Sequence, residues 1–197
     1  MKPFSSDRWG SSALLVLVCV IVASQTGVWA QKLKSDADQR YLVLSTKKLS
    51  TMEKELDEAA SSGFMVVLGA PTSTAEMGLF LERLATPEAP SKYQLLATSR
   101  VKTMEKELNE AAKEGFHVLA QTFISKKGMF TNEIVVVLER PPTIVKDYDY
   151  RLLAAIREKT IHKELAALIE EGYELIAMLT FGEHVLIMER ARELGAE

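Results

Sequence analysis

Apolar and polar residues follow a pattern along the chain that occurs three times. Each occurrence begins with a short segment rich in leucine and valine, which predicts a β-strand. A segment of helical periodicity follows, in which Met52, Leu56, Ala59 and Ala60 share one face and charged residues occupy the other. Two further apolar segments come next. The pattern therefore predicts three units, each made of a strand, an amphipathic helix and two more strands.

The helical segments carry the clearest internal repeat. The stretch Thr51 to Phe64 returns as Thr103 to Phe116 with eleven of fourteen positions identical, and a diverged copy runs from Thr160 to Tyr173. An aromatic residue, a threonine and a glycine keep the same spacing in every copy: Tyr41, Thr51 and Gly63; Tyr93, Thr103 and Gly115; Tyr150, Thr160 and Gly172. This regularity indicates a tandem triplication.

Local signals predict where each helix begins and ends. The threonine is placed to cap the first free backbone amides, and the glycine is placed to end the helix in the left-handed backbone region. Glu53 and Glu105 are expected in the first turn, where the helix dipole favours negative charge.

The strands are predicted from the apolar segments on either side of each helix. First strands are expected at Tyr41–Ser45, Tyr93–Thr98 and Tyr150–Ala155, and second strands at Phe64–Leu68, Phe116–Ala120 and Tyr173–Met178. Third strands are expected at Glu76–Arg83, Glu133–Arg140 and Glu183–Arg190, each closing on a Glu-Arg pair. Proline-containing linkers at Thr86–Pro90 and Pro141–Thr143 separate the units.

These elements predict an α+β protein of three tandem β-α-β-β modules at residues 40–85, 92–141 and 147–191. Each module is expected to hold a mixed three-stranded sheet and one helix, and the modules are expected to pack together. Strands such as Ile134–Leu138 are apolar on both sides, which indicates that both sheet faces are covered. Because one helix covers only one face, we expect the sheets to turn their second faces toward one another with the helices outside, or to do so in an oligomer.

The first thirty residues have the composition of a signal peptide. Lys2 and Arg8 precede an unbroken apolar run from Ala13 to Ala23, which is too short to span a bilayer. We predict cleavage after Ala30, a polar linker over residues 31–39, and export to the periplasm or the medium. An uncleaved membrane anchor is the alternative; after cleavage no stable membrane span is expected. The lone cysteine, Cys19, would leave with the leader.

Charge excludes one class of partner. The chain has 24 basic and 27 acidic residues, and these are mixed along its length. It therefore lacks the basic field that condenses on phosphate backbones, and we expect no nucleic-acid partner.

The third copy carries a recognisable motif. Its Glu171-Gly172-Tyr173-Glu174-Leu175 segment is followed by a strand pair that ends at Glu189-Arg190. This resembles a small bacterial family known only as a domain of unknown function, whose members typically carry Glu-Gly-Trp-Glu-Leu in a β-α-β-β setting. The other copies depart further, with Gly115-Phe116 and Gly63-Phe64 at the motif's centre. The resemblance implies the fold and no activity.

Several residue types invite a site hypothesis, and each has a structural alternative. His117, His162 and His184 occupy the start of a second strand, a first helical turn and the start of a third strand, without the spacing of metal ligands. We interpret them as exposed or structural. The arginines of the Glu-Arg pairs are candidates for anion binding or for maintaining the fold: Arg83, Arg140 and Arg190. Fold maintenance is favoured.

The aromatic residues of the repeat are candidates for a ligand cage, and the core is the favoured interpretation: Tyr41, Tyr93, Tyr150, Phe64, Phe116 and Tyr173. The hairpin segment Ser125–Phe130 places Met and Phe at its tip, either to contact a partner or to continue the strand pairing.

No catalytic signature is present in the sequence: it has no nucleophile elbow and no phosphate-binding glycine loop. We assign no catalytic, cofactor-binding or metal-ligating residue and expect no cofactor. The leading hypothesis is a non-enzymatic exported scaffold for binding or assembly, with recognition in its variable hairpin loops. The alternative is an enzyme or small-molecule binder with a site between modules that uses residues such as His117 or His184. The expected partner is a protein or a small molecule, and a homo-oligomer is possible.

Overall fold

The computed structural model describes residues 39–72, 76–85, 89–127, 132–144, 146–180 and 182–193. The predicted signal peptide at 1–30, residues 31–38 of the predicted linker, Thr86–Glu88 and the loop tip Gly128–Phe130 lie outside the described residues. Asp38–Glu197 forms one compact unit. No helix among the described residues has the length and hydropathy needed to cross a bilayer.

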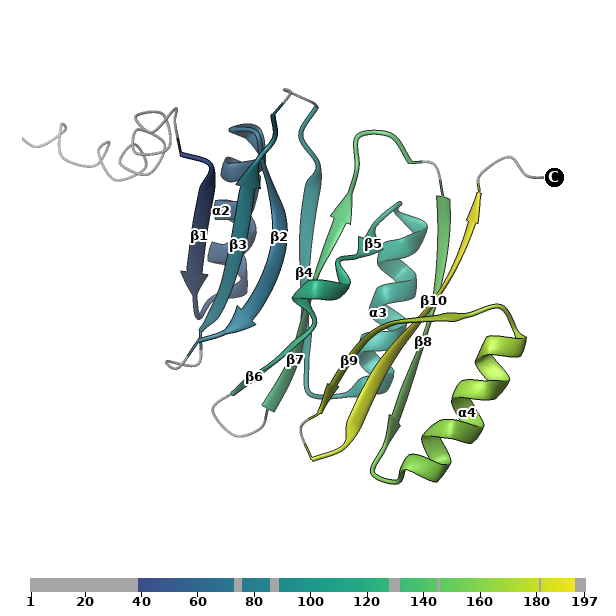
Figure 1. Ribbon diagram of the computed structural model, residues 1–197. Coiled ribbons are helices and arrows are strands. Elements are labelled where there is room, and N and C mark those ends of the chain that lie inside the picture. The colour runs from purple at the N-terminus through teal and green to yellow at the C-terminus, as the bar shows by residue number, and fades with distance from the viewer. Residues whose placement is uncertain are drawn as a thin grey trace, which may run out of the picture. The chain divides into compact units, whose positions relative to one another are not determined.

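Three modules of the predicted kind follow one another in the chain (Figure 1). The first contains β1 (Tyr41–Thr46), α2 (Leu49–Ser61), β2 (Phe64–Pro71) and β3 (Met77–Arg83). The second contains β4 (Lys92–Thr98), α3 (Val101–Lys113), β5 (His117–Val118), the short 3₁₀ turn η1 (Ala120–Thr122), β6 (Ile124–Lys127) and β7 (Asn132–Arg140). The third contains β8 (Lys146–Ala155), α4 (Glu158–Glu170), β9 (Glu174–Thr180) and β10 (His184–Glu193). The predicted α+β class is confirmed.

In each sheet the third strand of the module lies in the centre. The strand orders are β1-β3-β2, β4-β7-β5 with β6 also on β7, and β8-β10-β9. All of these pairs are antiparallel, so the predicted mixed sheets are wrong. The reason is topological: the first and second strands run in the same direction but never pair, because the third strand separates them. In the middle sheet η1 interrupts the second strand, which leaves four strands.

The helices begin three residues earlier than threonine caps would predict. Lys48, Arg100 and Arg157 are the N-cap residues, and none has a side-chain cap. The predicted threonine caps are therefore wrong. In the first two modules a threonine of the preceding strand accepts the N-cap amide instead: Thr46 from Lys48 at 3.3 Å, and Thr98 from Arg100 at 3.2 Å. The predicted glycine ends are confirmed, since these glycines have φ values of 83°, 85° and 86°.

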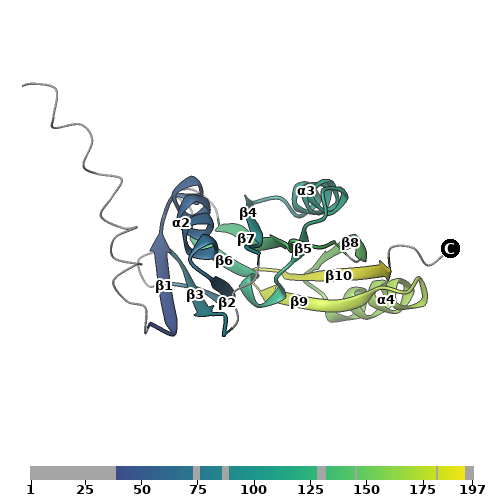
Figure 2. The same ribbon diagram turned by 90° about the horizontal axis from the view of Figure 1, so that it is seen from above.

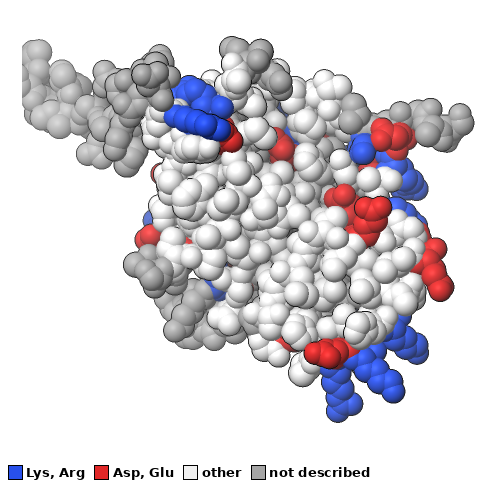
Figure 3. Space-filling view, viewed as in Figure 1, with Lys and Arg blue, Asp and Glu red and all other residues white. Residues whose placement is uncertain are grey.

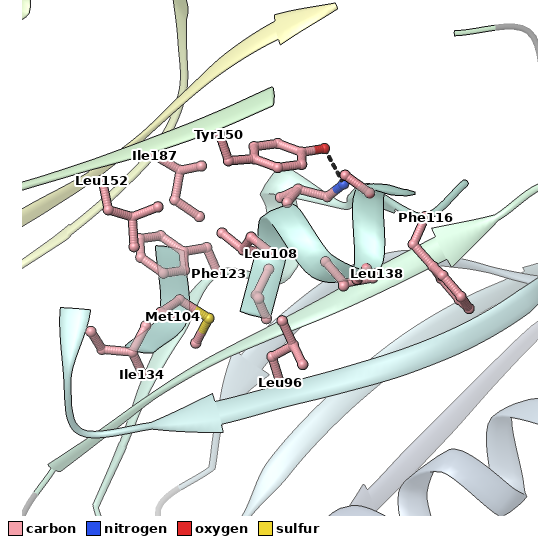
Figure 4. Packing of buried hydrophobic residues seen from close by; sticks show 14 of the residues in the cluster. Leu96, Met104, Leu108, Phe116, Phe123, Ile134, Leu138, Tyr150, Leu152 and Ile187 are labelled. Atoms are coloured by element: carbon pink, nitrogen blue, oxygen red, sulfur yellow. Dashed lines mark hydrogen bonds between the residues drawn. The ribbon is translucent and has the colours of Figure 1, made fainter. Parts of the chain in front are cut away.

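One continuous core joins the second and third modules (Figure 4). It contains the apolar face of α3, with Met104 and Leu108, and the sheet face that α3 covers, with Val136 and Leu138. The third sheet contributes one of its own faces to the same core: Tyr150, Leu152, Val185 and Ile187. The helix covers only part of the face beneath it, and the sheet of the next module covers more.

This arrangement corrects the predicted packing of second faces against each other. In the third module, the sheet face that lies away from α4 packs on the helix-bearing side of the second module, and α3 lies beside β8 (Figure 2). We call the residues where one module meets the next a junction. At this junction the helix-bearing face of the earlier module packs on the bare sheet face of the later module.

The first junction shows the same direction of contact between modules. α2 packs beside β4, and β2 approaches η1 closely. A Cβ atom at Gly69 would lie 3.1 Å from Cα of Thr122, so any larger residue there would require η1 to shift by a few tenths of an ångström. Lys126 of β6 donates to the carbonyl of Lys47 at 2.8 Å. The described part of the segment Ser125–Phe130 thus continues the strand pairing and also contacts the first module.

Candidate functional site

A buried tyrosine links the two modules at the second junction. The amide N–H of Val118 in β5 donates to Oη of Tyr150 at 3.0 Å (Figure 4). This hydroxyl donates to Glu189 at 2.9 Å. Burial raises the pKa of Tyr150, so the hydroxyl stays protonated and keeps both roles. The first junction repeats the contact with Val66, Tyr93 and Glu139, at 3.4 and 3.3 Å.

A helix glutamate forms the second repeated contact between modules. Glu105 of α3 accepts the amide N–H of Leu152 at 2.8 Å. Glu53 of α2 accepts the amide N–H of Leu95 at 3.1 Å. These residues occupy the fifth position of their helices, so their predicted place in the first turn is wrong. They satisfy outward amides of β8 and β4, which are edge strands of their sheets.

Asn109 adds a contact that only the second junction has. Its side-chain oxygen accepts the amide N–H of Tyr150 at 2.9 Å, and its amide nitrogen donates to the carbonyl of Tyr150 at 2.9 Å. The first module has Asp57 at the same repeat position. A carboxylate cannot donate, so Asp57 cannot make this two-bond contact.

The Glu-Arg pairs are used within the fold. The guanidinium of Arg83, Arg140 and Arg190 lies 4.2, 5.3 and 4.5 Å from the ring centre of the aromatic residue that follows the glycine. Each also donates to a carbonyl at the end of its module's helix, at 2.9, 3.4 and 3.1 Å. A cation at this end complements the helix dipole. The geometry supports fold maintenance over anion binding for these arginines.

The histidines occupy three separate environments in the structure. His117 is half-buried, stacks on Tyr148 at 5.5 Å and places Nε2 3.6 Å from Glu139. Burial lowers the pKa of His117, against the opposing effect of the Glu139 carboxylate. His162 is exposed on α4, at the fifth helix position and not in the first turn, and His184 lies 2.9 Å from the hydroxyl of Thr180. Among the described residues, no group of three or more His, Cys, Asp or Glu side chains is arranged to hold a metal ion.

A charged groove of about 550 Å³ lies between α3 and β8. Its basic residues are Lys102, Lys106, Lys113, Arg151 and Arg192, and its acidic residues are Glu105, Asp147 and Asp149. Several of these charges have partners within the protein: Glu105 lies 3.6 Å from Lys102, and Asp149 lies 2.7 Å from Arg190. Neither His117 nor His184 lines the groove.

The first sheet has an apolar face that no other described element covers. Residues that are paired across β1, β3 and β2 share a face of this sheet. The helix α2 lies on the other side of the sheet from the uncovered face (Figure 2). The exposed large side chains on the uncovered side are Tyr41, Val43, Met65, Leu68 and Phe80, which we call the open sheet face. Figure 3 shows a broad area with few charged side chains over this region, and the ion pair of Arg40 and Glu82 lies at its edge beside Tyr41. The open sheet face is the candidate functional site.

Two sequence predictions fail at this site. The aromatic residues of the repeat are buried as predicted, except Tyr41, which is 54% exposed where Tyr93 and Tyr150 are 7% and 1% exposed. The predicted cover on both faces of every sheet is not found within one chain for the first sheet, because no other described element packs on its second face. The predicted alternative, cover by an oligomer, stays a prediction. Aligning Tyr41 with Tyr93 and Tyr150 and then asking which neighbour each copy has would have revealed the site.

The chain matches no family model, and searches of curated proteins and of solved structures found no significant similarity. The resemblance to a domain family of unknown function therefore stays a prediction.

Proposed function

We propose that this chain is a non-catalytic exported scaffold that binds a protein partner through the open sheet face. The open sheet face then binds the partner, and the hairpin loops contribute less to this binding than the sequence predicts. The observation that carries the proposal is the exposure of five large apolar side chains on one sheet face. Contiguous apolar surface of this kind marks interaction sites in proteins.

The filled core of the second junction supports a scaffold over an enzyme. An enzyme site between modules would need a cavity lined by polar residues of one copy. The residues that meet there are apolar and buried, including Leu108, Leu138 and Ile187. The charged groove beside this core has acidic residues with partners inside the protein, and its arrangement offers no nucleophile with an adjacent base.

Photo-crosslinking tests whether the open sheet face binds a partner. A benzophenone amino acid replaces Val43 in the full chain, and a matched variant carries it at Lys54, which is exposed on α2. In cells that produce the protein, we expect a crosslinked product of discrete mass from position 43 and none from position 54. Irradiation that leaves only uncrosslinked chain from position 43 would contradict the proposal.

A further inference from the structure

At Tyr41, Val43 and Phe80, the open sheet face corresponds to repeat positions that are buried in both of the other modules. Its Val43 occupies the repeat position of Leu95 and Leu152, and its Phe80 occupies that of Val137 and Ile187. The four internal residues are all buried, while Val43 is 55% exposed. The first module therefore presents the same half of a junction that the second and third modules use to pack on the module before them.

The other half of a junction is exposed at the opposite end of the array. Leu175 of β9 is 47% exposed, although its counterparts Val66 and Val118 are buried at the two junctions. Ile169 of α4 and Met178 of β9 are also exposed. We call Ile169, Leu175 and Met178 the C-terminal face. α2 and α3 each have four buried residues and α4 has none, because no described element packs on the outer side of α4.

We propose that the open sheet face of one copy packs on the C-terminal face of a second copy, which repeats between chains the junction that each chain already contains twice. This inference rests on the proposed function and names its partner as the chain itself. Two unlike faces pair in such a contact, so the contact is heterologous. It closes into a ring if the rotation per copy allows, and otherwise extends as a filament.

The internal junctions specify the polar contacts that this interface needs. The amide N–H of Leu175 corresponds to those of Val66 and Val118, which donate to Tyr93 and Tyr150. It therefore donates to Oη of Tyr41 of the second copy. Within its own module Glu82 lies opposite Tyr41, as Glu139 and Glu189 lie opposite their tyrosines. Arg40 binds Oε1 of Glu82 at 2.8 Å, and Oε2 can accept from the Tyr41 hydroxyl.

One position weakens the interface relative to the internal junctions. Glu53 and Glu105 accept an amide of the next module's first strand, and His162 occupies their position in α4. A carboxylate accepts this bond more strongly than an imidazole, which accepts only when it is neutral. The junction between copies is therefore weaker than the junctions within a copy. A weaker contact is consistent with association between chains that have already folded.

A pair of variants, each with one face disabled, tests the proposal. Val43→Glu disables the open sheet face and Met178→Glu disables the C-terminal face, and both side chains are more than half exposed, so the fold tolerates the change. Lys54→Glu on α2 is the matched control for added negative charge. The protein is recovered from expression of the complete sequence, circular dichroism checks the fold, and sedimentation gives the mass against concentration.

Head-to-tail packing predicts a specific pattern of masses. The unmodified chain and Lys54→Glu associate as concentration rises, and each face variant alone associates at least about tenfold more weakly. An equal mixture of the two face variants forms a dimer and nothing larger, because one intact copy of each face remains. If Met178→Glu alone still dimerises, the open sheet faces pair with each other and the proposal is overturned.

Two further outcomes separate this inference from the proposed function. If the pure chain stays monomeric up to about 1 mM while position 43 crosslinks to a different protein, the scaffold stands and the head-to-tail contact is overturned. If position 43 crosslinks to nothing, the proposed function fails as well. His162→Glu sharpens the test: it restores the repeated acceptor, and we expect it to strengthen association several-fold while the same change at the exposed Lys163 does not.

Discussion

Tyr41 and Tyr150 occupy the same place in two copies of one module, and their surroundings are opposite. Tyr150 is buried against the second module, where it accepts one hydrogen bond and donates another. Tyr41 is exposed, and the adjacent Arg40 lies 5.0 Å from its ring centre and binds Glu82 at 2.8 Å. The difference shows that a repeat position acquires its role from the neighbouring module and not from its own sequence.

The same difference separates the helices. α3 packs on its own sheet and beside β8, and its glutamate and asparagine bind the backbone of β8. α4 packs only on its own sheet within the described residues, through half-buried Ile161, Leu165 and Leu168. The helix α3 therefore contacts two sheets, its own and that of the next module, whereas α4 contacts only its own sheet within the described residues.

The largest expected effect is the loss of the buried tyrosine. Tyr150→Ala leaves a cavity in the shared core and removes both hydrogen bonds of the hydroxyl. We therefore expect it to lower the free energy of unfolding by about 3–5 kcal/mol. Tyr41→Ala is its matched control and should change the stability of the monomer by less than about 0.5 kcal/mol. Denaturant unfolding of both variants measures the difference. Equal losses at the two positions would show that the tyrosine acts within its own module.

A smaller effect is expected from the helix glutamate. Glu105→Ala leaves the amide of Leu152, a buried residue, without its acceptor and should cost about 1–3 kcal/mol. His162→Ala, at the same position of α4, should be neutral within about 0.5 kcal/mol. Amide hydrogen exchange at Leu152 provides a direct readout, since it should accelerate in Glu105→Ala. Unchanged protection would mean that the bond contributes nothing to the junction.

The two junctions are expected to differ at a single amide. Asn109→Asp removes the donor to the carbonyl of Tyr150 and should lower stability by about 1 kcal/mol. The reciprocal change, Asp57→Asn, lies at the first junction and should be neutral or slightly stabilising. Thermal unfolding of both variants at neutral pH compares them. A loss of stability in Asp57→Asn would contradict this account of the difference.

The smallest effect is a pH dependence at the second junction. Burial lowers the pKa of His117, so in acid the unfolded chain binds this proton before the folded chain does. The contribution of neutral His117 is complete above its unfolded pKa of about 6.5 and is lost as pH falls through the lower folded pKa. Glu189 has the opposite sign, because burial raises its pKa and protonation then favours the folded state.

Subtracting a histidine variant isolates this effect. The stability of the unmodified chain minus that of His117→Gln should fall as pH decreases below about 6.5. His162→Gln, at an exposed position, should show no comparable trend. Urea unfolding at several pH values measures both differences. A difference that rises toward acid would indicate that Glu139, and not burial, controls His117.

Much of each module was predictable from local sequence, and little of the site was. The apolar face of α2, with Met52 and Leu56, is buried as predicted, and Gly63 ends the helix as predicted. The threonine cap was predicted wrongly because Lys48 begins the helix before Thr51 is reached. Glu53 and Glu105 were assigned to the helix dipole because their true partners, the amides of Leu95 and Leu152, lie in another module.

The sequence by itself determined the triplication, the order of elements in each module and the apolar face of each helix, because these depend on periodicities within a few turns or strands. The tertiary structure alone decided the strand order, the single direction of the junctions and which copies of a repeated residue are exposed. Those features depend on what lies across a junction. The local sequence around equivalent residues such as Tyr41 and Tyr150 does not reveal which module packs beside them.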